Sequence, residues 1–168
     1  MATYNHNLST LIRFNFWANG RLLTACEQLP ADAFTRDVTP DPGWGSLRGI
    51  LVHILDAEYG WRMVLQELDA DVILKTADFA DVAALKARWN RERAAWFDYA
   101  ASLSEDSLDT ASSTGLTVWQ TILHVVTHGS QHRGEAALIL TAYGQSPGEL
   151  DFDLFLQENT ETQDWSNL

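Results

Sequence analysis

With 168 residues, of which 46% are hydrophobic and 11% aromatic, the chain has the size and composition of one folded domain spanning 1–168, which argues against a disordered protein. A net charge of −12 and scattered basic residues argue against nucleic acid or an anionic membrane as a partner. No stretch approaches the ~18 apolar residues of a membrane span, no secretory signal pattern opens the chain, and the single cysteine excludes intramolecular disulfides and thiolate clusters, so we expect a cytoplasmic protein.

Four segments repeat hydrophobic residues with the period of an amphipathic helix. They cover about 7–29, 46–68, 80–103 and 117–143. No run alternates with the two-residue period of a strand. A short segment, 150–157, follows Pro147 and is expected to pack as one or two extra turns across the bundle. The sequence therefore predicts an all-α fold, a four-helix bundle with a short C-terminal extension.

Several residues predict where these helices begin and end. Pro30 stops the first segment, and Ser46 is a candidate N-cap for the second. Thr117 lies three residues before Gln120, which is the spacing of a capping box. Gly144 closes the fourth segment, because glycine adopts the left-handed conformation that ends many helices. The boundaries of the fourth helix are thus the best defined.

Three of the five histidines, His124, His128 and His132, lie four residues apart in the fourth segment. Side chains at this spacing lie about 6 Å apart on one flank of a helix and can meet at one metal ion. On a helical wheel, His132 lies about 40° from the centre of the buried stripe, His128 about 80° and His124 about 120°. The wheel therefore favours His128 and His132 as a ligand pair and leaves His124 on the flank or in contact with a ligand.

A catalytic zinc ion usually has three protein ligands and one open position, so a third ligand is expected from another element. The remaining histidines are His6 and His53. We favour His53, because small residues beside it in the second segment leave room for an ion between helices. The sequence thus predicts a divalent metal site formed by His53, His128 and His132. Imidazole suits zinc, nickel and iron alike, so the metal stays open.

Other polar residues project toward the predicted core. Asn15 and Asn19 lie on the apolar stripe of the first segment, and Glu58 lies on that of the second. Buried polar groups need partners, so these residues either form a hydrogen-bond network between the two helices or place Glu58 near the metal, against a ligand or as a proton acceptor. Arg93 and Arg133 either bind an anionic substrate or pair with the surplus acids.

Three motifs and the C-terminal tail together resemble one known family. They occupy residues 15–19 (NFWAN), 53–58 (HILDAE), 123–135 (LHVVTHGSQHRGE) and 150–152 (LDF). In this order they are similar to the DinB family of metalloenzymes, also called the DinB/YfiT-like group. The likeness runs from about residue 8 to about residue 156.

This resemblance implies an up-down-down-up four-helix bundle, usually homodimeric, in which the family's metal ligands match His53, His128 and His132. It also implies a link to thiol chemistry, since the members with assigned activity are thiol S-transferases or isomerases that use a low-molecular-weight bacterial thiol. Glu135 departs from the family pattern, because many relatives carry glutamine there. A carboxylate three residues after His132 is expected to strengthen a hydrogen bond to that ligand or to change the charge of the pocket.

Three neutral imidazoles leave the charge of a divalent ion uncompensated, so the ion acidifies bound water or thiol. We therefore expect a metal-dependent enzyme that acts on a small molecule, either as a thiol-dependent S-transferase or as a hydrolase. The alternative is a non-catalytic, dimeric, stress-related protein that binds metal or a small molecule. Trp44 is the tryptophan expected at the pocket rim, and Cys26 is expected to be a buried structural thiol.

Overall fold

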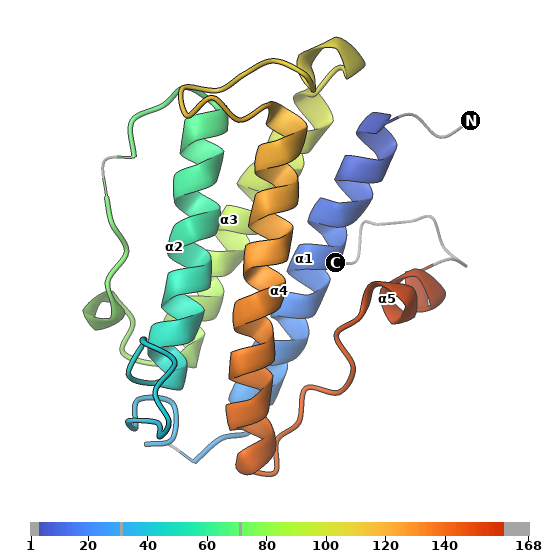
Figure 1. Ribbon diagram of the computed structural model, residues 1–168. Coiled ribbons are helices and arrows are strands. Elements are labelled where there is room, and N and C mark those ends of the chain that lie inside the picture. Colours follow the sequence, from blue (N-terminus) through green and yellow to red (C-terminus); the bar gives the residue numbers. More distant parts are fainter. Residues whose placement is uncertain (1–3, 31, 71, 160–168) are drawn as a thin grey trace.

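The computed structural model describes residues 4–30, 32–70 and 72–159 and is built from helices (Figure 1). The long helices are α1 (Tyr4–Cys26), α2 (Leu47–Leu65), α3 (Val82–Ser102) and α4 (Val118–Ala142). Shorter helical elements are η1 (Thr76–Asp78), η2 (Glu105–Ser107) and α5 (Phe152–Asn159). The described residues contain isolated bridges but no β-strand. The all-α prediction is therefore confirmed.

The four long helices form the predicted up-down-down-up bundle. In Figure 1, α1 and α4 run in one direction while α2 and α3 run in the other. α1 packs against α3 and α4, and α2 packs against α4 and, over a smaller area, against α3. The connection between α2 and α3 returns along the length of the bundle, where the carboxylate of Asp56 accepts a hydrogen bond from the Leu74 N–H at 2.7 Å. Metal ligands on α2 and α4 would thus come from adjacent helices.

The predicted caps are present at the helix ends. The Ser46 hydroxyl accepts a hydrogen bond from the Gly49 N–H at 3.1 Å at the start of α2. At the start of α4, the side chains of Thr117 and Gln120 each accept a hydrogen bond from the other residue's backbone N–H. Gly144 follows α4 with a φ of 75°. Local chemistry therefore fixes where the two helices that carry the histidines begin.

The predicted limits of the first helix, residues 7–29, are wrong by three residues at each end, because α1 spans Tyr4–Cys26. After Cys26 the chain tightens into a turn in which the Leu29 N–H donates to the Cys26 carbonyl at 3.1 Å. Proline disfavours the helical conformation in the residue before it, so Pro30 ends the α-helix earlier than the apolar period does.

The core is formed by apolar side chains from all four long helices. Those with no exposed surface include Leu22, Leu47, Ile50, Leu51, Ile54, Leu55, Leu85, Ile122, Ala136 and Leu140. Burying each large aliphatic side chain contributes about 1.5–3 kcal/mol. The predicted C-terminal turns form α5, whose fully buried Phe155 packs against Phe14 and Trp17 of α1 at ring distances of 5.8 and 5.6 Å. This contact attaches α5 to the bundle.

A buried polar network connects the four long helices. Glu58 Oε1 accepts hydrogen bonds from the side-chain amides of Asn15 and Asn19 at 2.6 and 2.7 Å. Its Oε2 accepts one from the Trp89 indole at 2.6 Å. Arg133 donates from Nη1 to the Oδ1 atoms of the two asparagines at 2.7 and 3.0 Å. The network predicted between the first two helices is present, and it extends to α3 and α4.

This network joins two ionisable groups inside the core. Burial raises the pKa of Glu58 to about 7, although the bonds from Asn15, Asn19 and Trp89 favour the charged form. Burial likewise lowers the pKa of Arg133 to about 10. The helices approach so closely here that a Cβ at Gly129 would lie 2.6 Å from Arg133 Nη1 and 2.9 Å from Asn15 Oδ1. Glycine at 129 therefore makes room for the network.

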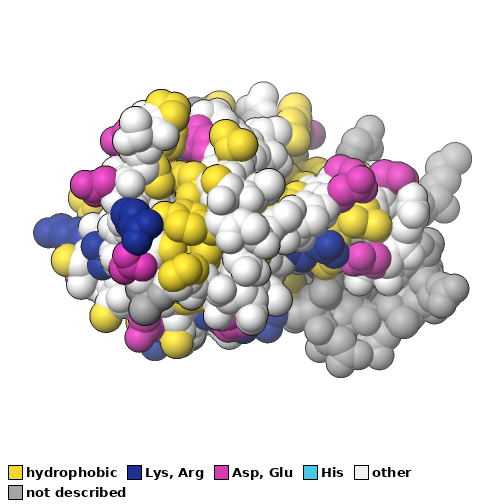
Figure 2. All heavy atoms as spheres, turned by 90° about the horizontal axis from the view of Figure 1, so that it is seen from below, with side chains coloured by type: hydrophobic (Ala, Val, Ile, Leu, Met, Phe, Trp, Pro, Cys, Tyr) yellow, Lys and Arg dark blue, Asp and Glu magenta, His cyan; other side chains and the backbone are white. Residues whose placement is uncertain are grey.

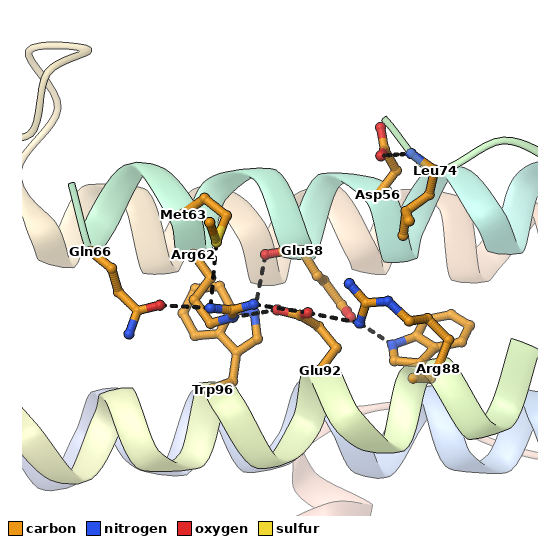
Figure 3. A network of polar contacts seen from close by, with 10 residues as sticks. Asp56, Glu58, Arg62, Met63, Gln66, Leu74, Arg88, Glu92 and Trp96 are labelled. Atoms are coloured by element: carbon orange, nitrogen blue, oxygen red, sulfur yellow. Dashed lines mark hydrogen bonds and ion pairs between the residues drawn. The ribbon is translucent and has the colours of Figure 1, made fainter. Parts of the chain in front are cut away.

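A second polar cluster joins α2 to α3 (Figure 3). Glu92, which is 1% exposed, accepts hydrogen bonds from Arg62 Nη2 and Arg88 Nη1 at 3.1 and 3.0 Å. Nearby, the Trp96 indole donates to the Glu58 carbonyl at 3.1 Å. Two arginines thus compensate a carboxylate that would be costly to bury alone.

Figure 2 shows the bundle from below, with hydrophobic side chains near the centre and charged side chains of both signs around them. Neither sign covers a broad area in this view. Among the described helices, none combines the length and the apolarity that crossing a lipid bilayer requires.

We expect Glu58→Gln to lower the free energy of unfolding at about pH 5 by about 1–3 kcal/mol. The NH2 group of the glutamine would face the N–H donors of Asn15 and Asn19 or that of Trp89, where the wild-type protein has an accepting oxygen. The wild-type protein loses stability as the pH rises, since the pKa of Glu58 is about 7 when folded against an ordinary value of 4.5, so the folded state holds a proton that the unfolded state releases. The gap between the two proteins should narrow by on the order of 2 kcal/mol by about pH 7.5. Urea unfolding at both pH values measures it, and a gap independent of pH would contradict the prediction.

Candidate metal centre

Exposure of the three α4 histidines follows the order given by the wheel. His132 is 6% exposed, His128 is half-buried and His124 is exposed. His53, on α2, is half-buried and lies opposite them. Because α2 packs against α4, the two helices bring His53 together with His128 and His132.

The three imidazoles form a compact cluster. Their ring centroids are 4.8 Å apart for His53 and His128, 4.7 Å for His53 and His132, and 4.6 Å for His128 and His132. The Nε2 atoms of His53 and His128 lie 3.0 Å apart. Two imidazole nitrogens at this distance need either a shared proton or a cation between them, since their lone pairs repel.

A carboxylate orients one ring of the cluster. Nδ1 of His132 lies 2.8 Å from Oε2 of the half-buried Glu135. An ionised carboxylate can only accept, so Nδ1 carries the proton and Nε2 keeps its lone pair. Metal-binding histidines in proteins are commonly fixed in this way. Glu135 therefore leaves His132 ready to bind a cation through Nε2.

The surroundings favour neutral imidazoles. Burial, followed by the proximity of His132, lowers the pKa of His53. Burial and the neighbouring histidines lower the pKa of His128 to about 4. Ligation requires a deprotonated nitrogen, so the lowered pKa values keep both rings available to a cation at a pH where an ordinary histidine begins to be protonated.

The donor set fits a divalent ion. The cluster offers one nitrogen from each of three histidines, and these atoms all lie within 4.8 Å of one another. Nitrogens bound to tetrahedral zinc are about 2.0–2.1 Å from the ion and hence about 3.3 Å apart. The separations of the three nitrogens therefore exceed that spacing by at most about 1.5 Å.

The structure separates His124 from the cluster. Its ring meets that of Trp61 edge to face at 4.9 Å and lies 5.8 Å from that of His128. The group of mutually close nitrogens does not include it. His124 therefore occupies the flank of α4 that the wheel predicts.

The remaining candidates lie elsewhere. Glu58 is held in the interior by asparagine and tryptophan donors. Arg133 is buried and so is not placed to bind a substrate; it donates to two asparagines, the Ser130 hydroxyl and a backbone carbonyl, and its charge pairs with the Glu58 carboxylate through those asparagines. Arg93 lines a groove of about 610 Å³ beside Arg21, and among the described residues that border this groove there is no histidine.

Sequence reasoning missed two partners in the core. Trp89 and Glu92, both buried on α3, pair with Glu58 and with arginines of α2 and α3. A signal was present, because Glu92 lies three residues after Trp89 and four before Trp96, on the buried stripe of its helix. A charged residue in that position indicates a buried ion pair.

Comparison with known proteins agrees with this architecture. The DinB family model matches residues 1–164. The chain belongs to the DinB family. A curated relative, Protein DinB of Bacillus subtilis (strain 168), is 22% identical over 159 residues, which cover 87% of this chain and 91% of the relative. The DinB match extends over the four long helices and α5, so the resemblance predicted from the motifs is confirmed.

We expect a divalent ion bound to this DinB-family protein to dissociate as the pH falls toward about 5, because protons compete for the imidazole nitrogens. The lowered pKa values of His53 and His128 oppose protonation, so occupancy should persist below the ordinary histidine pKa of 6.5. Dialysis at stepped pH followed by elemental analysis measures the release. Full occupancy near about pH 4 would indicate carboxylate ligands instead.

Proposed function

We propose that this protein is a metal-dependent enzyme that activates a thiol or water nucleophile at a divalent ion held by His53, His128 and His132. The observation that carries the proposal is the number of converging ligands. Over the described part of the chain, no fourth histidine, cysteine or carboxylate joins the three nitrogens. Structural zinc sites are closed by four protein ligands, whereas catalytic sites keep a position open. Three ligands favour a site that accepts a reactant.

When bound, the ion would supply Lewis acidity that favours the deprotonated form of a thiol or water. Zinc, nickel and iron are candidates, since imidazole suits all three. The protein's own groups prepare the site: Glu135 fixes the tautomer of His132, and the low pKa of His128 keeps its ring unprotonated. Both effects hold the ligands in their metal-binding form at neutral pH.

A thiol used by such an enzyme would come from a small molecule. Cys26, the single cysteine of the chain, is 2% exposed in the core, and burial raises its pKa to about 12. A thiol with that pKa stays protonated and unreactive at neutral pH. A thiol-dependent S-transferase built on this site would therefore take a low-molecular-weight thiol as co-substrate, and hydrolysis of a small molecule is the other reaction suited to the site.

A rival function of another class is a non-catalytic, stress-related protein in which the ion only ties α2 to α4. One observation supports this rival: the ligands come from two adjacent helices, which an ion would link. Either role is compatible with a homodimer, which we include in the proposal. The exposed hydrophobic side chains along α4 support it, since Leu123 and Leu138 are 40% and 74% exposed.

We expect the untagged wild-type protein to contain one divalent ion per chain, and His53→Ala, His128→Ala and His132→Ala each to lose it, since two imidazoles rarely hold such an ion. His124→Ala is the matched control, because it removes a neighbouring imidazole of α4 that is not a proposed ligand. Elemental analysis after gel filtration measures the content. Retention in all three variants, or equal loss in the control, would refute the ligand assignment.

We expect His128→Ala to abolish turnover while lowering the Tm of the metal-free protein by less than about 4 °C, because the half-buried ring adds little to the core. Turnover is assayed with a panel of small thiols, electrophiles and esters, and Tm by circular dichroism. The rival function predicts the reverse pattern: no turnover by the metal-loaded wild-type protein and a large fall in its Tm when a chelator removes the ion.

A further inference from the structure

Trp44, in the connection between α1 and α2, covers two of the three clustered histidines. Its indole stacks on the imidazole of His53 with ring centroids 3.6 Å apart and an interplanar angle of 15°. The same indole meets the ring of His132 edge to face at 5.6 Å and 88°. Trp44 is 36% exposed, so it separates these two rings from solvent on one side.

The turn that presents Trp44 is held by one carboxylate. Oδ1 of Asp41 accepts hydrogen bonds from the backbone N–H groups of Gly43, Trp44 and Gly45 at 2.8, 2.9 and 2.8 Å. These bonds lower the pKa of Asp41, so the carboxylate stays charged at neutral pH. Gly43 and Gly45 have φ values of 110° and 73°, which other residues adopt only with strain. The backbone on both sides of Trp44 is therefore fixed.

The same turn is packed against the start of α2. The Trp44 carbonyl accepts a hydrogen bond from the Ser46 N–H at 2.9 Å, and a Cβ at Gly49 would lie 1.8 Å from this carbonyl oxygen. Only glycine permits so close an approach. His53 follows Gly49 by four residues, about one helical turn. The position of the indole is thus set relative to the helix that carries His53.

The rings of His132 and His53 are oriented by different kinds of contact. His132 is oriented by Glu135 through Nδ1. For His53, the described residues provide a contact at Nε2, to His128, but no hydrogen bond at Nδ1. A ligand histidine normally needs a second contact that fixes its ring. For His53, the stacked indole of Trp44 takes the role that a hydrogen bond at Nδ1 has for His132.

We infer that Trp44 is a positioning residue of the metal centre: its indole holds the His53 imidazole in the plane that directs Nε2 toward His128. The expected effect on metal affinity rests on the proposed function. The orientation of the His53 ring does not, because the indole stacks on it in the absence of an ion. Replacing an outer contact of a metal ligand commonly weakens binding by about 10–100-fold. Loss of the indole should have an effect of that size.

The test compares Trp44→Leu with Trp44→Phe, which keeps an aromatic face, and with Trp119→Leu as the matched control. Trp119 is 39% exposed, close to the value for Trp44, and lies in the first turn of α4, away from the cluster. In the metal-free protein, NMR measures the NOEs between the ring protons of His53 and those of His128, whose ring centroids lie 4.8 Å apart. These NOEs report the orientation of the His53 ring, whereas its chemical shift would change on loss of the indole alone. In the metal-loaded protein, competition with a chromophoric chelator measures the Kd for zinc.

We expect Trp44→Leu to weaken the NOEs between the His53 and His128 rings and to weaken zinc binding by about 10–100-fold, with helical content unchanged. Trp44→Phe should retain most of the affinity, and Trp119→Leu should match the wild type in both measurements. Unchanged NOEs between His53 and His128 in Trp44→Leu, an unchanged Kd, or an equal loss in Trp119→Leu would each overturn the inference.

A wild-type protein that binds no zinc, nickel or iron would refute the proposed function, not the orientation of His53. The NMR comparison of the metal-free proteins would then decide the positioning role alone. Loss of the NOEs between His53 and His128 in Trp44→Leu, with the NOEs retained in Trp44→Phe and Trp119→Leu, would support it, and equal NOEs in all the variants would overturn it.

Discussion

The burial of one carboxylate, that of Glu58, constrains the arrangement of all four long helices. An ionisable group in the core costs several kcal/mol unless donors surround it. Asn15, Asn19 and Trp89 provide them from α1 and α3, and Arg133 of α4 adds a compensating charge through the asparagines. A shift of any helix by one residue would remove a donor from the centre of the bundle. The network therefore specifies helix register in a way that aliphatic packing alone does not.

The metal centre depends on this register because it uses the same two helices. Arg133 follows His132 directly on α4, so the rotation that directs the arginine into the core also places the histidine beside α2. On α2, Glu58 faces the interior while His53 faces α4. The polar core and the histidine cluster are thus two sides of one interface. Gly129, which lies between His128 and His132 in the sequence, leaves room for Arg133 and Asn15 of the polar core.

Helical periodicity predicted much of this arrangement from the sequence. The wheel ordered His132, His128 and His124 by burial, and it placed Glu58 in the core, because both properties depend on direction around a single helix. It did not identify Arg133 as a partner of the asparagines, since a wheel carries no information on which helices face each other. The wheel could not predict the stacking of Trp44 on His53 either, because Trp44 lies in a connecting segment that has no helical periodicity. The resemblance to the DinB family added the connection order.

The connection order has a consequence for how the chain folds. Consecutive helices α1 and α2, and likewise α3 and α4, lie across diagonals of the bundle, while the largest contacts join α1 to α4 and α2 to α4. Most of the core thus forms between segments that are distant in sequence, and closing such long loops costs entropy before any contact repays it. A bundle in which each helix packed on the next would collapse from local hairpins. In this molecule, α1 and α2 each make their largest contacts with α4, so much of the core forms only when α4 packs against them. The helix that carries two of the clustered histidines therefore also completes the fold.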